Sequence, residues 1–488
     1  MSNTQDIVQR LWNLCHILRH DGVGYHEYVI ELTLLLFLKM AKETETESKL
    51  PKGYRWDDLR KLEGTEQLDF YRRMLIDLGN AKSPLVRGVY GGTGTRLTKP
   101  THLERLVKSI DALDWYSARE EGLGDLYEGL LEKNAAERKS GAGQYFTPRP
   151  LIDSMVALMK PKPGEVVQDP ACGTGGFLIA ADRYVKSQTD ELFNLSDAEQ
   201  KFQIQQAFVG VELVADTRRL GLMNCMLHNI EGPPGTEGCL RLGDTLSGDG
   251  ARLEPADVIL ANPPFGTKGA GSATRDDFTY PTNNKQLAFL QHMYRGLKPG
   301  GRAAVVLPDN ILFEEGVGRD IRRDLMNKCD LHTILRLPTG IFYAGGVKTN
   351  VLFFTRGKKD TGNTKEVWVY DLRANMPSFG KRTPFTREDH LAPFEKAFGK
   401  SPLGKSKRTD EGEEGRFRCF SLEDIEKRNW NLDIAWLRDE DADSAEDLGE
   451  PEDIANEIQV ELRTALEELE ELTALLESPT TTEEEAAE

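Results

Sequence analysis

The chain has 488 residues, enough for two or three domains and a sizeable hydrophobic core. The longest apolar stretch near its start, Val29 to Ala41, is interrupted by Glu31, Thr33 and Lys39, which excludes a transmembrane helix there. Residues 2–10 lack the basic-then-apolar pattern of a secretory signal, so we expect a cytoplasmic chain with no membrane partner. The six cysteines lie far apart and form no Cys-x-x-Cys pair, so we expect no metal site and no disulfide framework, only free buried thiols.

The net charge of −18 is concentrated at one end of the chain. From Asn431 onward there are 21 acidic and two basic residues, a net charge of −19, whereas the first 430 residues carry +1. A strongly acidic segment repels phosphate, but a nearly neutral body can still hold a basic groove. The charge asymmetry therefore indicates that the tail, residues 431–488, has a function other than DNA binding.

Residues 1–138 are expected to form a helical domain, because apolar residues recur at helical spacing in several stretches. We expect a first helix around Val8 to Leu18 and a second from about Tyr28 to Lys42. A third follows Thr101, which is a candidate N-cap. The glycine-containing stretch 88–94 is expected to be a loop.

From about Glu165 the pattern changes to short β-rich runs that alternate with helical stretches. This alternation predicts an α/β fold, a doubly wound Rossmann-like sheet, over residues 139–395. The expected strands, each with the helix that follows it, are 166–167 with 178–185, 208–211 with 217–228, 258–261 with 286–297, 303–307 with 319–328, and the strand 331–336. Residues 350–356 and 366–370 are two further expected strands, and an antiparallel pairing between them is one option.

Residues 396–430 are expected to be a loop-rich connection to the acidic tail. Within the tail, residues 451–477 carry leucines and isoleucines at spacings of three and four, which predicts a helix with one apolar seam. Two alternatives stay open for that seam. It packs on the body of this chain, or it docks on a helix of a partner.

The first set of residues that points to chemistry is a glycine-rich loop, Asp169 to Phe177, directly after the expected strand 166–167. Glycines let a backbone turn tightly and approach a ligand, and the following helix directs its first amides at an anion. The strand before the loop and the helix after it favour a nucleotide-binding loop over a simple turn. The next strand ends in Glu212, where a carboxylate can accept hydrogen bonds from ribose hydroxyls, although a surface acid is the alternative.

The second set is Asn262-Pro263-Pro264-Phe265, directly after the expected strand 258–261. The two prolines remove two amide donors, so the loop presents acceptors, namely the Asn262 side-chain oxygen and the Pro263 carbonyl. Two acceptors on the hydrogens of an aromatic amine would free its delocalised lone pair for attack. Phe265 adds a ring on which a planar base can stack. A proline-rich turn with a buried phenylalanine is the alternative.

These two sets resemble motif I and the catalytic motif of amino-methyltransferases, in that chain order. The resemblance implies that the glycine-rich loop binds the methionine part of S-adenosyl-L-methionine through Asp169, Ala171, Gly173, Thr174, Gly175 and Gly176. It implies that the Asn262–Phe265 loop binds a flipped adenine. Another stretch resembles the segment that closes over this cofactor: Gln144, Tyr145, Phe146, Thr147, Pro148 and Arg149. Asp244 resembles the strand-end acid near the adenine ring of the cofactor.

The combination is similar to the modification subunits of type I restriction–modification enzymes, over roughly residues 1–380. That family implies base flipping, because the N6 amine of adenine is unreachable in stacked DNA, followed by direct methyl transfer without a metal. It also implies four partners: double-stranded DNA, a DNA-specificity subunit, a second copy of the modification subunit and a restriction/translocation subunit.

Two other functions fit the same motifs. A protein glutamine-N5 methyltransferase also acts on a planar nitrogen, but its motif usually ends in tyrosine, whereas this chain has Phe265. The large helical domain also favours a DNA substrate. A cofactor-binding scaffold without catalysis is the second alternative, and the intact Asn262–Phe265 set argues against it.

Overall fold

The computed structural model describes residues 7–11, 13–14, 25–43, 46–115, 147–265, 275–342, 347–377, 379 and 383–437. Three expectations lie outside these residues. They are the tail helix over 451–477, the cofactor-closing residues Gln144, Tyr145 and Phe146, and residues 12 and 15–18 of the first helix, whose residues 7–11 and 13–14 are helical.

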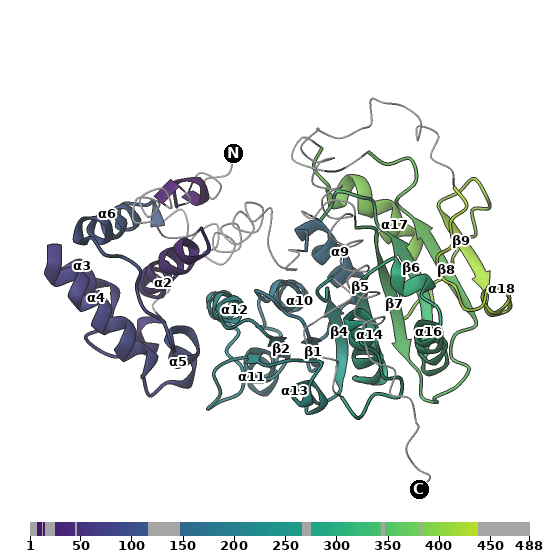
Figure 1. The fold of residues 1–488 in the computed structure, drawn as a ribbon, viewed down its shortest axis with the longest axis horizontal. Helices are drawn as coiled ribbons and strands as arrows, with labels where there is room; N and C mark the ends of the chain where they lie inside the picture. The colour runs from purple at the N-terminus through teal and green to yellow at the C-terminus, as the bar shows by residue number, and fades with distance from the viewer. Residues whose placement is uncertain are drawn as a thin grey trace, which may run out of the picture.

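The described N-terminal part consists of helices joined by short turns and loops. Its elements are α2 (Tyr25–Glu43), η1 (Thr46–Lys49), α3 (Trp56–Arg60), α4 (Gly64–Gly79), α5 (Pro84–Tyr90) and α6 (Pro100–Asp111), and Figure 1 shows them as one group beside the sheet. The helix expected near residues 28–42 is confirmed as α2. Every helix in the described ranges is too short or too polar to cross a membrane.

One local expectation for this part was wrong and another was right only in part. Thr101 is not a cap, because α6 starts at Pro100 with Lys99 as its N-cap. Proline has no amide hydrogen to satisfy, so it fits the first helical position. Of the loop expected over 88–94, residues 91–94 are loop. Residues 88–90 are helical, because α5 continues through Tyr90 and buries Val89 and Tyr90. The burial of an apolar face outweighs the low helix propensity of Gly88.

The second part is built on a nine-stranded sheet with the strand order β3-β2-β1-β4-β5-β7-β6-β8-β9. Strands β3, β2, β1, β4 and β5 run parallel to one another, whereas β7 is antiparallel to both β5 and β6. The strands are β1 (Val167–Asp169), β2 (Phe208–Glu212), β3 (Leu240–Leu242), β4 (Ala256–Ala261), β5 (Leu297–Pro308), β6 (Cys329–Arg336), β7 (Thr349–Arg356), β8 (Glu366–Asp371) and β9 (Phe417–Ser421).

Helices cover both faces of this sheet, as Figure 1 shows. They are α9 (Arg149–Met159), α10 (Gly176–Gln188), α11 (Asp197–Gln205), α12 (Ala215–Leu227), α13 (Gly248–Ala251), α14 (Lys285–Arg295), α15 (Asn310–Phe313), α16 (Val317–Lys328), η2 (Arg387–Leu391), α17 (Ala392–Phe398) and α18 (Leu422–Lys427). The expected α/β fold is confirmed, and each of the five predicted strands of the alternating region is found.

The far end of the sheet differs from expectation. β7 and β8 are both strands, but they do not pair with each other, because β6 lies between them. β8 runs parallel to β6 and antiparallel to β9. β9 lies inside the stretch expected to be a loop-rich connection, so the sheet continues beyond residue 395. The free thiols are as expected: four of the five described cysteines are buried and Cys419 is partly buried.

Helix α12 joins the sheet to the N-terminal helices. It contacts α2 and α5, and Arg219 on α12 reaches across to two backbone carbonyls. Its Nε donates to the carbonyl of Val89 at 2.7 Å, and its Nη2 donates to that of Gly91 at 3.0 Å. Since α12 follows β2, the N-terminal helices are fixed directly to the β1–β2 side of the sheet.

Candidate active site

Three of the predicted site residues lie at the carboxyl ends of neighbouring parallel strands. Asp169 is the last residue of β1, Glu212 is the last residue of β2, and Asn262 directly follows β4. β1 pairs with both β2 and β4, so these three ends meet at one edge of the sheet. Ligands of open α/β sheets bind at this edge, which makes it the candidate site.

The glycine-rich loop adopts the tight turn that its sequence predicts. Gly173 and Gly175 have φ angles of +52° and +83°, in the region that favours glycine. Gly175 is the N-cap of α10, and no side chain in the described part of the chain caps that helix. The Thr174 carbonyl is held by the Asn224 amide at 3.1 Å. The first amides of α10 therefore point outward without a side-chain acceptor.

Two acidic groups are buried at this edge with no cation from the described residues beside them. Burial raises the pKa of Asp169 to about 8, and the nearby charge of Glu212 adds to that shift. Burial also raises the pKa of Glu212, although hydrogen bonds from backbone amides oppose the shift. The Glu212 carboxylate accepts from the amides of Gly173 at 3.0 Å and Val214 at 2.8 Å. A bound cation would stabilise the ionised form of both groups.

Asp244 lies in the loop after β3, where its Oδ1 accepts from the Leu246 amide at 2.8 Å. The neighbouring Thr245 hydroxyl donates to the Pro170 carbonyl, which ties this loop to the glycine-rich loop. The structure therefore brings Asp244 to the same edge as Asp169 and Glu212.

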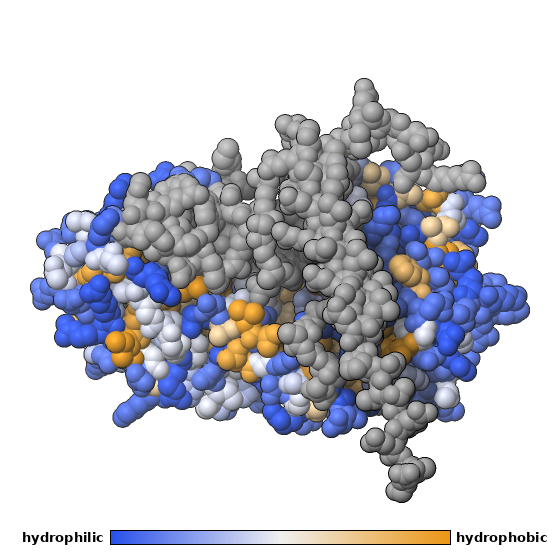
Figure 2. Space-filling view, in the orientation of Figure 1, coloured by the Kyte–Doolittle hydropathy of each residue, from blue (hydrophilic) through white to orange (hydrophobic). Residues whose placement is uncertain are grey.

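Two leucines that the sequence reasoning missed also lie here. Leu213 follows Glu212, and Leu242 is opposite Glu212 in the register of β2 and β3. Their exposed fractions are 64% and 53%, unusually high for leucine. Figure 2 shows apolar surface on the face where Figure 1 draws β2 and α12. The sequence signal that could have identified Leu213 is an apolar residue directly after the acid at a strand end.

The Asn262–Phe265 loop holds its asparagine in one orientation. The Nδ2 of Asn262 donates to the Thr147 hydroxyl oxygen at 2.9 Å. The Oδ1 of Asn262 is buried and has no hydrogen-bond partner among the described residues. Leaving a buried acceptor unpaired costs about 1–3 kcal/mol. Because this atom lies at a strand end beside the glycine-rich loop, a donor from a ligand would satisfy it there.

The other residues of this loop divide by exposure. Pro263 is buried, Pro264 is exposed and Phe265 is half-buried. The ring of Phe265 meets the ring of Phe342 edge-on, with centroids 5.7 Å apart and planes at 85°. Phe342 lies after β6 and was not predicted as a site residue, because no local sequence pattern separates it from a core phenylalanine.

Helix α9 connects the two loops. Thr147 and Pro148 precede it and Arg149 is its first residue, so these three predicted cofactor residues lie at its N-terminus. Thr147 contacts Asn262, while Ile152 lies so close to Gly176 that a Cβ added there would be 3.3 Å from the Ile152 Cδ1. The start of α9 therefore touches both the glycine-rich loop and the Asn262 loop.

A parallel sheet with a glycine-rich loop after β1, an acid at the end of β2 and an Asn-Pro-Pro-Phe loop after β4 defines the class of amino-methyltransferases. Residues 118–445 match the family model described as N-6 DNA Methylase, and the chain belongs to this family. It is therefore an adenine-specific DNA methyltransferase.

Comparison with known proteins gives a more specific class of DNA methyltransferase. The chain is 55% identical to the type I restriction enzyme StySPI methylase subunit of Salmonella potsdam, over 96% of this chain and 95% of that protein. It is 54% identical to the EcoKI methylase subunit of Escherichia coli strain K12, with the same coverage. The predicted resemblance to type I modification subunits is confirmed.

The structure is also similar to solved structures of this kind. The crystal structure of the EcoKI M protein matches with a TM-score of 0.59 and 50% identity, and the match covers 98% of each chain. A chain from a type I restriction–modification structure described for complex assembly and conformational transition matches with a TM-score of 0.70 and 28% identity. That match covers 98% of this chain and 100% of the other.

Proposed function

We propose that the carboxyl edge of β1, β2 and β4 binds S-adenosyl-L-methionine and a flipped adenine side by side, and that the chain methylates the adenine N6 in duplex DNA. The observation that carries the assignment of the site is the buried, unpartnered Oδ1 of Asn262 at the strand end next to the glycine-rich loop.

The residues at this edge fit the cofactor. Asp169 and Glu212 are buried acids that a cationic ligand would stabilise. Leu213 and Leu242 expose apolar surface that suits the faces of an adenine ring, and Asp244 lies beside them. When bound, S-adenosyl-L-methionine supplies an electrophilic methyl group on a sulfonium.

The Asn262 loop would bind and orient the target base. The Oδ1 of Asn262 and the carbonyl of Pro263 would accept the two hydrogens of the adenine amine, which frees the nitrogen lone pair for attack. Phe265 would stack on the base, and Phe342, in contact with the Phe265 ring, would hold that ring in place. The base must leave the helical stack to reach these groups, so the enzyme flips it at a cost of a few kcal/mol.

The chain would act as the modification subunit of a type I restriction–modification complex. Its similarity to StySPI and EcoKI methylase subunits along nearly the whole chain supports this role. The proposed partners are a DNA-specificity subunit, a second copy of this chain and a restriction/translocation subunit. We propose that the leucine-seamed segment 451–477 docks on the specificity subunit. Deleting residues 451–488 should then weaken co-purification, and unchanged assembly would refute the docking.

Methyl transfer from labelled cofactor to duplex DNA, with and without the specificity subunit, tests the function directly. The Asn262→Ala variant should lose about 10²- to 10³-fold in rate, the usual effect of removing one preorganised polar group from a catalytic site. Asn194→Ala is the matched control, because Asn194 is exposed and lies in the turn between α10 and α11, where the chain has left the carboxyl ends of the strands. Label in a protein instead of DNA would favour the glutamine-N5 alternative, and full activity of Asn262→Ala would refute the assigned site.

A further inference from the structure

We infer that Thr147 is a positioning residue for Asn262: its hydroxyl oxygen holds the carboxamide so that Oδ1 faces the amine of the target base. This inference rests on the proposed function. It gives Thr147 a role that differs from contact with the cofactor, which the sequence resemblance implies.

The hydrogen bond between the two side chains carries the argument. A carboxamide has two donors on Nδ2 and acceptor capacity on Oδ1. Because Nδ2 donates to the Thr147 hydroxyl oxygen at 2.9 Å, Oδ1 lies on the opposite side of the group, where it is buried and has no partner. If the carboxamide turned by 180°, its NH₂ group would face the hydrogens of the adenine amine. Two donors would then meet, and neither would have an acceptor.

The backbone around Thr147 is fixed, which keeps its hydroxyl within hydrogen-bonding distance of the Asn262 carboxamide. Pro148 follows it and is the N-cap of α9, and the Pro148 carbonyl accepts from the amides of Leu151 at 3.0 Å and Ile152 at 3.1 Å. The proline ring also restricts the backbone of the preceding residue, Thr147, to extended conformations.

The other end of α9 is fixed as well. The buried Arg302 donates to the carbonyls of Met159 at 2.6 Å and Lys160 at 2.7 Å. It also forms a two-point ion pair with Glu165, with both distances at 2.8 Å. With both ends held, α9 presents the Thr147 hydroxyl at a fixed place beside the β4 loop.

A valine substitution separates positioning from cofactor binding. Thr147→Val keeps the size and branching of the side chain but removes the hydroxyl, so Asn262 loses its acceptor. In the complex of this chain with the specificity subunit, kcat for DNA methylation should fall about 10- to 100-fold. Small misplacements of catalytic groups have effects of this size. The affinity for S-adenosyl-L-methionine, measured by calorimetry, should not change. Thr147→Ser keeps the hydroxyl and should restore kcat. An unchanged kcat in Thr147→Val, or a loss confined to cofactor affinity, would overturn the inference.

A double variant tests whether Thr147 acts through Asn262. If it does, adding Thr147→Val to Asn262→Ala should slow methylation no further, because the group being oriented is already gone. Multiplied losses would instead show an independent role and overturn the inference. The two proposals fail separately. Full activity of Asn262→Ala refutes the assigned site, whereas an inactive Asn262→Ala with a fully active Thr147→Val refutes only the positioning role.

Discussion

Two aspartates at the same edge of the sheet have opposite electrostatic environments. Asp169 ends β1 and is buried with no described cation beside it, and its pKa is raised to about 8. Asp309 directly follows β5. Burial alone would raise its pKa too, but hydrogen bonds and charge from Arg373 lower it below its usual value. Arg373 binds both carboxylate oxygens, at 2.7 and 2.8 Å, and Asn350 adds a third hydrogen bond at 2.7 Å.

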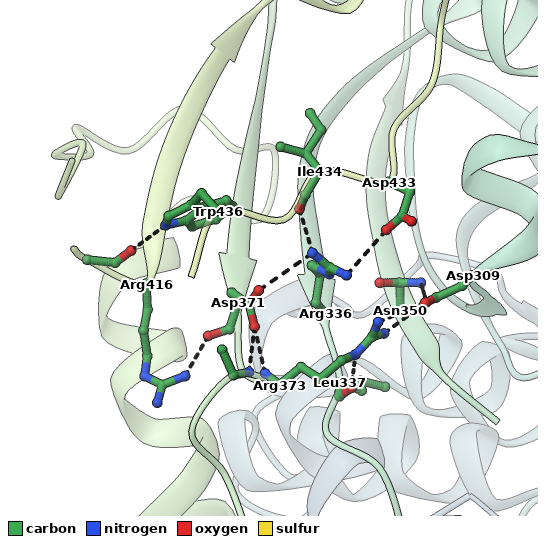
Figure 3. Close-up of polar contacts among 12 residues, drawn as sticks. Asp309, Arg336, Leu337, Asn350, Asp371, Arg373, Arg416, Asp433, Ile434 and Trp436 are labelled. Carbon is green, nitrogen blue, oxygen red and sulfur yellow. Dashed lines mark hydrogen bonds and ion pairs between the residues drawn. The ribbon is translucent and has the colours of Figure 1, made fainter. Parts of the chain in front are cut away.

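Figure 3 shows that the cluster around Asp309 is largely satisfied from within the chain. Arg336 bonds the Ile434 carbonyl at 2.6 Å and Asp433 at 3.2 Å, and the Asp371 carboxylate lies 3.6 Å from it. Charges here are paired by residues from β6, β7, β8 and the first residues of the tail. At the β1–β2 end, no cation among the described residues pairs with the two acids. We therefore interpret the Asp309 cluster as structural, and the β1–β2 end as a site suited to a cationic ligand.

Removing Arg373 tests the claim that Asp309 belongs to a structural ion cluster, and it should have the largest effect on stability. Arg373→Met keeps the apolar stem but leaves the Asp309 carboxylate without its cation. Breaking such a largely buried pair costs about 3–5 kcal/mol. Urea unfolding should show this loss, whereas Arg72→Met, which breaks an exposed pair with Asp69, should cost less than about 1 kcal/mol. Equal losses in the two variants would contradict the comparison.

Asp169→Asn tests the claim that Asp169 is a buried acid with a raised pKa. The folded protein keeps a proton on Asp169 that the unfolded chain releases above its ordinary pKa of 3.8, so rising pH should cost stability up to about pH 8. Asp169→Asn removes this contribution, and its melting temperature should fall less between about pH 5 and pH 8. The exposed Asp276→Asn controls for the loss of one charge.

The same Asp169→Asn variant should bind S-adenosyl-L-methionine about 10-fold more weakly, because a neutral amide does not stabilise a cation; a tenfold change is about 1.4 kcal/mol. Calorimetry measures this affinity. Parallel pH–stability curves for Asp169→Asn and the unmodified protein, together with an unchanged affinity, would remove the electrostatic argument for the site.

Leu213→Ser should give the smallest effect. We expect a loss of about 2- to 5-fold in cofactor affinity, since roughly one exposed apolar contact to an adenine ring disappears. Stability should change by less than about 0.5 kcal/mol because Leu213 is exposed. Phe193→Ser is the control, because Phe193 is 80% exposed and lies in a turn away from the strand ends. Equal cofactor affinity in both variants would exclude Leu213 from the site.

The sequence predicts the placement of Asp169, Glu212 and Asn262 because each lies at or directly after a strand end, and parallel pairing brings such ends together. Leu213 and Phe342 were not predicted, since single apolar residues resemble core positions until their exposure or contacts are known. The contact between Thr147 and Asn262 joins residues 115 positions apart, and no local pattern encodes it.

Two strands were missed for a similar reason. β3 has only three residues, and β9 lies in a stretch rich in charge and glycine. β9 is stabilised by pairing with β8 and by the contact between the rings of Phe417 and Trp368, whose centroids are 4.9 Å apart. Tertiary contacts decide strand formation where local propensity is weak.

The guanidinium of Arg219 has a consequence for dissecting this enzyme. It is buried, and two of its three nitrogens bond carbonyls of residues 89 and 91. A fragment starting near residue 139 would lose both acceptors and expose the side of α12 that faces α2 and α5. We therefore expect the helical region and the catalytic sheet to melt in a single cooperative transition, and expression of the catalytic part alone to yield aggregated protein.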